Sequence, residues 1–277
     1  MPVLNCAGIP LVIDRPVVMG IINITPDSFF EESRKQTIDE VLFQAEKMLE
    51  EGASILDVGG QSTRPGSVLI EVDEEARRIM PVISALKARF SDAVISVDTY
   101  HSQTAKLAVA EGANMINDIS GGLLDVAMIE TVGVLNVPYV CMHMRGNPVT
   151  MNLPENLVYD DLITDITDFF IKQYDLCKKA GIKDVILDPG FGFSKTIAQN
   201  FELVKRLNDF SGLDLPVLLG VSRKSSIVKT LNVTVESALN GTTVLNTIGL
   251  MNGASILRVH DVKEAVECVK LFNMMYR

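Results

Sequence analysis

Polar side chains that could bind or transform a small anionic molecule follow eight short apolar segments of the sequence. In chain order they are Asn23, Asp57, Asp98, Asn117, Asp118, His143, Asp188, Ser222, Arg223, Lys224, Arg258 and His260. Carboxylates and amides can read the N–H and C=O edge of a heterocycle, whereas Arg and Lys can hold an oxyanion. Segments that only supported a fold would not need polar residues at all eight ends, so the set predicts a binding or catalytic site.

Each of these residues also has a structural explanation when it is taken alone. Asp57 and Asp118 could begin turns or cap helices, which is a common use of Asp after a strand. His143 and His260 could be partly buried, hydrogen-bonded imidazoles. Arg and Lys side chains most often lie in solvent. The functional hypothesis therefore depends on whether the fold brings the whole set together.

Two loops have the composition of ligand-binding segments. Residues 59–66 and 188–195 directly follow apolar segments and contain several Gly and Pro residues. Turn formation explains the glycines, but it explains neither Arg64 in the first loop nor Phe191 and Phe193 in the second. Because long loops that follow strands directly are usual sites of function, we expect both loops to contact a ligand.

The elements that must position these residues alternate between helix and strand. Gly52, Gly112, Gly181 and Gly253 each precede a short apolar run, and glycine closes helices in the left-handed conformation that other residues avoid. The segments before them, such as residues 41–49, repeat apolar residues with a helical period. Unbroken apolar runs predict strands buried on both faces at 17–22, 54–57, 94–97, 115–117, 139–142, 185–187, 217–221 and 255–259.

Eight strands with helices between them predict an α/β fold, a single (β/α)8 TIM barrel that spans residues 1–277. An open doubly wound sheet fits less well, because no glycine-rich dinucleotide fingerprint follows the first strand. Leu4 and residues 11–13, on either side of Gly8-Ile9-Pro10, predict a short N-terminal hairpin that caps the barrel bottom. In such barrels the active site lies at the carboxyl ends of the strands, so the polar set should line one mouth.

The composition excludes several classes of partner. The 277 residues are 47% hydrophobic and 22% charged with a net charge of −10, which is an ordinary globular composition. The negative charge and the lack of a dense Lys/Arg run argue against nucleic acid or an anionic membrane as a partner. Without a targeting segment or a run of about 18 apolar residues, we predict a cytoplasmic protein. The spacing of Cys6, Cys141, Cys177 and Cys268 indicates buried thiols rather than a zinc site or disulfides.

At these residues the sequence resembles the dihydropteroate synthases over nearly its whole length. The matching segments are 19–29 (MGIINITPDSF), 57–66 (DVGGQSTRPG), 95–99 (ISVDT), 116–118 (IND), 142–144 (MHM), 187–193 (LDPGFGF), 220–225 (GVSRKS) and 256–262 (ILRVHDV). Chance does not produce this set in this order. The resemblance implies a transferase of folate biosynthesis, which joins 6-hydroxymethyl-7,8-dihydropterin pyrophosphate to p-aminobenzoate and releases pyrophosphate.

The resemblance also implies a role for individual residues. The pterin ring would be bound by Asp98, Asn117, Met142, Asp188 and Lys224, and the pyrophosphate by Asn23, Arg64, Arg258 and His260. Asn23 would also help to hold a Mg²⁺ cofactor. The p-aminobenzoate, and the sulfonamides that imitate it, would lie against Thr63, Pro65, Phe193 and Ser222.

Catalysis, by the same resemblance, would depend on Asp27, Arg64, Asp98 and Lys224. Two loops, residues 25–37 and 62–68, would complete the site. Two copies of the chain would form a homodimer through helices on the outside of the barrel, for which the last two helices are candidates.

Three departures from the family pattern are visible. Residues 30–33 read FEES where many relatives have Asp-Gly-Gly, Gln61 replaces a frequent Glu, and Ser194 replaces a frequent Gly. The first departure falls in the first site loop. Two other functions stay open. One is a pterin-dependent corrinoid methyltransferase barrel, which would not need the runs Thr63-Arg64-Pro65, Ser222-Arg223-Lys224 and Arg258-Val259-His260. The other is a pterin-binding protein without catalysis.

Overall fold

The computed structural model of the chain describes residues 2–24, 34–61 and 70–276. Its parallel strands lie in the order β8-β7-β6-β5-β4-β3-β10-β9. Their bounds are β3 (Val17–Asn23), β4 (Ile55–Gly59), β5 (Val94–Asp98), β6 (Met115–Asp118), β7 (Tyr139–Met142), β8 (Val185–Asp188), β9 (Leu218–Leu219) and β10 (Ile256–Val259). A parallel bridge between Leu187 and Val217 joins the two outer strands and closes the barrel. The predicted eight-stranded α/β barrel is confirmed.

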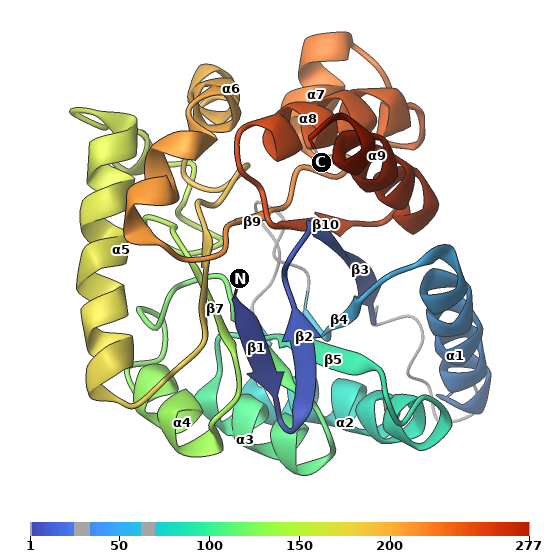
Figure 1. The fold of residues 1–277 in the computed structure, drawn as a ribbon. Coiled ribbons are helices and arrows are strands. Elements are labelled where there is room, and N and C mark those ends of the chain that lie inside the picture. Colours follow the sequence, from blue (N-terminus) through green and yellow to red (C-terminus); the bar gives the residue numbers. More distant parts are fainter. Residues whose placement is uncertain (1, 25–33, 62–69, 277) are drawn as a thin grey trace.

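Helices surround these strands on all sides (Figure 1). They are α1 (Arg34–Glu51), α2 (Val72–Arg89), α3 (Ser102–Ala110), α4 (Met128–Leu135), α5 (Leu162–Lys179), α6 (Ile197–Lys205), α7 (Ser225–Leu231), α8 (Leu239–Met251) and α9 (Val262–Met275), with short 3-10 turns η2 (Pro154–Asn156), η3 (Leu207–Leu213) and η4 (Glu236–Ala238). The glycines predicted to close helices do so: φ is +105° at Gly52, +110° at Gly112, +84° at Gly181 and +95° at Gly253.

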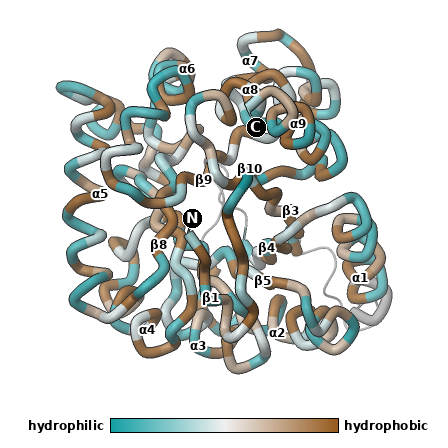
Figure 2. Tube along the Cα trace, viewed as in Figure 1, coloured by the Kyte–Doolittle hydropathy of each residue, from teal (hydrophilic) through white to brown (hydrophobic). Residues whose placement is uncertain are grey.

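The helical period explains how each helix lies on the barrel. In α1, Val41, Ala45 and Met48 are buried against the strands, whereas Phe43, on another face of the helix, is 71% exposed. Figure 2 shows the same alternation of hydrophobic and hydrophilic residues along α5. The strands need no such alternation, because the barrel interior lies on one face and the helices on the other.

An N-terminal hairpin covers one end of the barrel, as the sequence predicts. β1 (Val3–Cys6) pairs antiparallel with β2 (Ile9–Val12). The buried side chains of Leu4 and Cys6 pack in one apolar cluster with residues near the amino ends of the barrel strands, which are Val17, Met19, Ile55, Val94, Met115, Val140, Ile186, Leu218 and Ile256. In Figure 1 the hairpin lies across the middle of the ring. The amino ends of the strands therefore form a closed, apolar bottom.

The turn of this hairpin lies one step earlier than the sequence indicates. Cys6 pairs with Ile9, so the turn consists of Ala7 and Gly8, whose φ angles are +51° and +91°. Two left-handed residues in succession match the twist of a two-residue hairpin turn. Ile9 and Pro10, expected in the turn, belong to β2.

Among the residues that the structure describes, no helix is both long and apolar enough to cross a membrane.

Candidate active site

One charged centre lies inside the opposite end of the barrel. Arg258 in β10 donates from Nε to Asp57 Oδ2 of β4 at 2.7 Å and from Nη2 to Asp98 Oδ2 of β5 at 2.6 Å. Asn117 Nδ2 of β6 donates to the same oxygen of Asp57 at 3.1 Å. The guanidinium thus joins β10 to β4 and β5, and Asp57 extends the network to β6.

Strand register explains why these side chains meet. Asn23, Gly59, Asp98 and Asn117 occupy one row across β3, β4, β5 and β6. A Cβ on Gly59 would lie 3.4 Å from Asp98 Cβ and 3.7 Å from Asn23 Oδ1. Glycine therefore leaves the space between Asn23 and Asp98 open in the middle of the row.

The charged centre shifts the titration of its members. Burial raises the pKa of Asp98 to about 7, although Arg258 opposes this rise. Burial alone would lower the pKa of Arg258, but Asp57 and Asp98 raise it above its ordinary value. Arg258 is therefore a fixed cation, while Asp98 can change its charge near neutral pH.

A second group of site residues follows β8 and β9. Gly190 N donates to Asp188 Oδ1 at 2.8 Å, and the buried carboxyl of Asp188 lies in the field of Lys224. Lys224 Nζ donates to Phe191 O and lies 4.7 Å from the centre of the Phe193 ring. Burial lowers the pKa of Lys224 to about 8, although Asp188 opposes this fall.

An apolar wall lies beside Phe193. This residue and Met142 are both buried and belong to one cluster. Its members are Tyr100, Ile119, Met142, Met144, Met151 and Phe193. The predicted pterin contact Met142 and the predicted p-aminobenzoate contact Phe193 thus belong to one buried apolar cluster.

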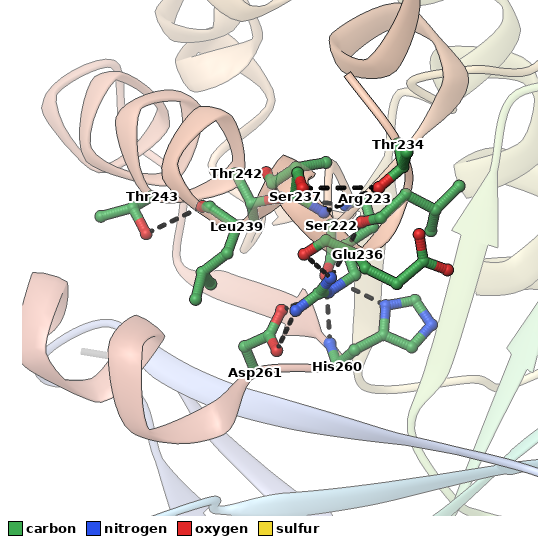
Figure 3. A network of polar contacts seen from close by, with 12 residues as sticks. Ser222, Arg223, Thr234, Glu236, Ser237, Leu239, Thr242, Thr243, His260 and Asp261 are labelled. Carbon is green, nitrogen blue, oxygen red and sulfur yellow. Dashed lines mark hydrogen bonds and ion pairs between the residues drawn. The ribbon is translucent and has the colours of Figure 1, made fainter.

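Hydrogen bonds and an ion pair join the turns after β9 and β10 directly. Ser222 Oγ lies 3.0 Å from His260 Nδ1 and accepts from His260 N at 3.2 Å. Arg223 binds both carboxylate oxygens of Asp261 at 2.8 Å and donates to Glu236 O of η4 at 2.7 Å (Figure 3). Ser222 and His260, predicted for different substrates, are therefore in contact.

The departure at Ser194 has a structural explanation. Its φ is +45°, in the left-handed region where glycine is the usual residue. Ser194 Oγ accepts from Arg145 N at 3.0 Å, and Ser194 O accepts from the Tyr159 hydroxyl at 2.9 Å. These bonds offset part of the strain, so the loop conformation survives the loss of the glycine.

Four predicted site residues, Asp27, Thr63, Arg64 and Pro65, lie outside the described residues. Asn23 lies at the exposed end of β3. Within residues 2–24, 34–61 and 70–276, no three His, Cys, Asp or Glu side chains form a metal-binding group.

Comparison with known proteins adds the decisive observation to this geometry. The family model for pterin binding enzymes matches residues 19–260. The dihydropteroate synthase of Escherichia coli strain K12 is 41% identical over 266 residues, which are 95% of this chain and 93% of that protein. The chain belongs to the dihydropteroate synthase family. Members of this family are transferases of folate biosynthesis.

Solved structures of family members have the same fold. The Yersinia pestis dihydropteroate synthase, solved as a complex with a sulfonamide drug, superposes with a TM-score of 0.92 at 40% identity, and the match covers 99% of each chain. The Xanthomonas albilineans dihydropteroate synthase with 7,8-dihydropteroate superposes with a TM-score of 0.87 at 34% identity, covering 100% of this chain and 99% of that one.

One member of the charged centre was not assigned a role from the sequence. Asp57 was noted at a strand end, where a turn or a cap explains an Asp equally well. The structure buries it completely and places it between Arg258 and Asn117. Only its hydrogen bonds to other strands distinguish a member of the charged centre from a turn or cap residue, and no local pattern in the sequence encodes those bonds.

Proposed function

We propose that the chain condenses 6-hydroxymethyl-7,8-dihydropterin pyrophosphate with p-aminobenzoate to give 7,8-dihydropteroate and pyrophosphate. The observation that carries this proposal is the charged centre, in which Arg258 joins Asp57 and Asp98 at the mouth of the barrel. It places a fixed cation beside carboxylates that can read a ring edge. Membership of the synthase family supports the same reaction.

The pterin ring binds deep in the mouth, against Asp98, Asn117, Met142, Asp188 and Lys224. The acids and the amide accept from ring N–H groups, and Lys224 donates to a ring acceptor. Buried polar groups of this kind discriminate strongly, because a wrong ligand leaves them unpaired. Asp188, which already accepts from Gly190 N, is held in one orientation for this contact.

The pyrophosphate is held by Asn23, Arg64, Arg258 and His260. Asn23 offers a carboxamide oxygen, a hard donor that suits Mg²⁺, and the remaining ligands of such an ion would be substrate oxygens and water. When bound, Mg²⁺ would neutralise part of the charge on the pyrophosphate.

The p-aminobenzoate lies against Thr63, Pro65, Phe193 and Ser222, and sulfonamides compete for this place. Phe193 supplies the flat apolar wall for the ring, and the Ser222 hydroxyl lies where a carboxylate can be bound. The Yersinia pestis relative, which was solved with a sulfonamide drug, supports this assignment.

The reaction proceeds by substitution at the methylene carbon of the pterin. Its C–O bond breaks early, and the electron pair leaves with the pyrophosphate. The amine nitrogen of p-aminobenzoate then forms the new C–N bond and releases its proton to the solvent. Asp27 and Asp98 stabilise the cationic pterin, while Arg64 and Lys224 stabilise the leaving charge and hold the substrates in line.

The whole of residues 1–277 works as one pterin-binding TIM-barrel domain in a cytoplasmic homodimer. The hairpin packs on the barrel bottom, which supports the single domain. All four cysteines are buried and free, as in a reducing compartment. For the homodimer, α8 and α9 expose apolar side chains, namely Val244, Ile248, Met251, Leu271, Met274 and Met275. The net charge of −10 does not favour a nucleic acid partner.

The test is to incubate the protein with dihydropterin pyrophosphate, p-aminobenzoate and Mg²⁺ and to measure pyrophosphate and dihydropteroate together. We expect equal amounts of both products and no pyrophosphate release without p-aminobenzoate. Binding of the pterin without turnover would instead identify a non-catalytic pterin-binding protein. Methyl transfer from a methylfolate to a corrinoid would identify the methyltransferase.

A further inference from the structure

A buried lysine, Lys195, lies beside the mouth and has no part in the proposed reaction. Its residue is 6% exposed. Its ammonium nitrogen lies 3.1 Å from each of three acceptors, His143 Nδ1, Gly190 O and Phe193 O. Burial lowers the pKa of Lys195 to about 7, although Asp188 opposes this fall. In its protonated form the amine has three N–H donors, and these contacts use all of them. Lys195 therefore acts on the protein rather than on a substrate.

His143 is built to accept this bond. It follows β7 directly and is buried, and burial together with the charge of Lys195 holds the pKa of His143 well below its usual value. A neutral imidazole that accepts at Nδ1 carries its proton at Nε2. The end of β7 thus supplies one fixed acceptor for the Lys195 ammonium.

The other two acceptors belong to the loop between β8 and α6, whose backbone turns through three left-handed residues. Its φ angles are +72° at Gly190, +85° at Gly192 and +45° at Ser194. Glycine adopts such angles freely, so only Ser194 is strained and depends on its surroundings to hold this conformation. A Cβ on Gly190 would lie 2.0 Å from His143 O, so the loop also packs closely on the end of β7.

Two lysines together bind three carbonyls of this loop. Lys195 binds the carbonyls of Gly190 and Phe193, and Lys224 binds the carbonyl of Phe191 between them. The Phe193 ring lies 4.7 Å from the Lys224 ammonium. A shift of the Phe193 carbonyl would move this ring, because both belong to one residue.

We propose that Lys195 is a positioning residue, which together with His143 holds residues 190–193 so that the Phe193 ring forms a wall of the p-aminobenzoate site. This inference rests on the proposed function. Lys195 contacts the carbonyl of Phe193 directly, and the ring of that residue forms this wall. Of the pterin site, Asn117 and Asp98 lie on other strands. Asp188 and Lys224 are each linked to the loop by one hydrogen bond, to Gly190 N and Phe191 O, so the pterin site depends on the loop less directly. Loss of Lys195 should therefore affect one substrate more than the other.

Two variants test this role. Lys195→Met keeps a similar chain length but removes all donors, and Lys195→Gln keeps an NH2 group without a charge. We expect Lys195→Met to raise the KM for p-aminobenzoate by about tenfold or more and the KM for dihydropterin pyrophosphate by less than about threefold, with Lys195→Gln between wild type and Met. Lys172→Met, the same change on the exposed side of α5, is the matched control and should alter neither KM.

A measurement independent of activity accompanies the kinetics. Hydrogen exchange of peptides that cover residues 189–196 should become faster in Lys195→Met than in wild type, while peptides from β3 and β4 stay unchanged. Equal increases in both KM values, or unchanged exchange in this loop, would overturn the positioning role. Absence of synthesis by the wild type would instead contradict the proposed function, and the exchange result would still test the hold on the loop.

Discussion

The two ends of this barrel are made from the same eight strands but differ completely in chemistry. At the amino ends, Met19, Ile55 and Ile256 pack with Leu4 and Cys6 of the hairpin in an apolar cluster. At the carboxyl ends, the strands bury Asp57, Asp98, Asn117 and Asp188. Burial of apolar side chains thus stabilises the bottom, whereas burial of charged groups at the mouth costs free energy unless those groups are paired. Stability and function are therefore separable along the barrel axis.

The largest effect should come from Lys224 at the mouth. We expect Lys224→Met to lower kcat/KM by about 10³-fold, because it removes a charge used by both the pterin and the transition state. The free energy of unfolding should stay within about 1 kcal/mol, because the variant no longer buries the Lys224 charge and this gain offsets the lost attraction to Asp188. Steady-state kinetics and urea denaturation measure the two quantities. Lys229→Met, an exposed change in α7, is the control. A large loss of stability in Lys224→Met would show that stability and function are not separable along the barrel axis.

The bottom should show the opposite result. Met19 is fully buried in the hairpin cluster, so Met19→Ala should lower the free energy of unfolding by about 2–5 kcal/mol. At a temperature where the variant is folded, kcat/KM should stay within about twofold of wild type. Val3→Ala, at an exposed position of the same hairpin, should change stability by less than about 0.5 kcal/mol. A fall in kcat/KM beyond tenfold for Met19→Ala would show that the two ends are coupled.

The titration of Asp98 offers a sharper comparison. Because burial raises its pKa to about 7 and the pterin N–H groups need the anion, affinity for 6-hydroxymethyl-7,8-dihydropterin should rise by up to about tenfold per pH unit below pH 7 and level off above it. Calorimetric titrations between pH 5.5 and 8.5, compared with Asp98→Asn, measure this rise. Identical pH profiles for the two proteins would exclude Asp98 as the titrating group.

The same group has the opposite effect on stability. A carboxyl with a folded-state pKa above its unfolded value stabilises the fold when both states are protonated, and this contribution is lost as the pH rises from about 4 through 7. The difference in unfolding free energy between wild type and Asp98→Asn should therefore decrease over this range. Ligand affinity and stability would then change in opposite directions at the mouth.

The smallest effect should come from the hydrogen bond that links the hairpin to Asp184, just before β8. Asn5 N donates to Asp184 Oδ2 at 2.8 Å on the surface, so Asp184→Ala should cost about 1 kcal/mol of stability. Thermal denaturation measures this change, and kcat/KM should be unaffected. A loss of activity would show that the hairpin influences the mouth.

Local patterns were sufficient to predict the barrel. The helical period before Gly52, the left-handed glycines and the unbroken apolar runs depend on residues close in the sequence, and the structure confirms the elements that they predict. Where a local signal was ambiguous, the predicted position was wrong by one residue. The hairpin turn begins at Ala7 and not at Gly8, because Ala7 takes a left-handed conformation that glycine favours.

The sequence by itself determined the family, the strand ends and the residue types at the mouth. The tertiary structure decided which of those residues work together. Asp57 and Arg258 are 201 positions apart, and His143 and Lys195 are 52 apart. Contacts over such separations depend on strand register and on closure of the ring, which bring the first and last strands side by side. A polar residue at a strand end is therefore visible in the sequence, but its partner is set only when the barrel closes.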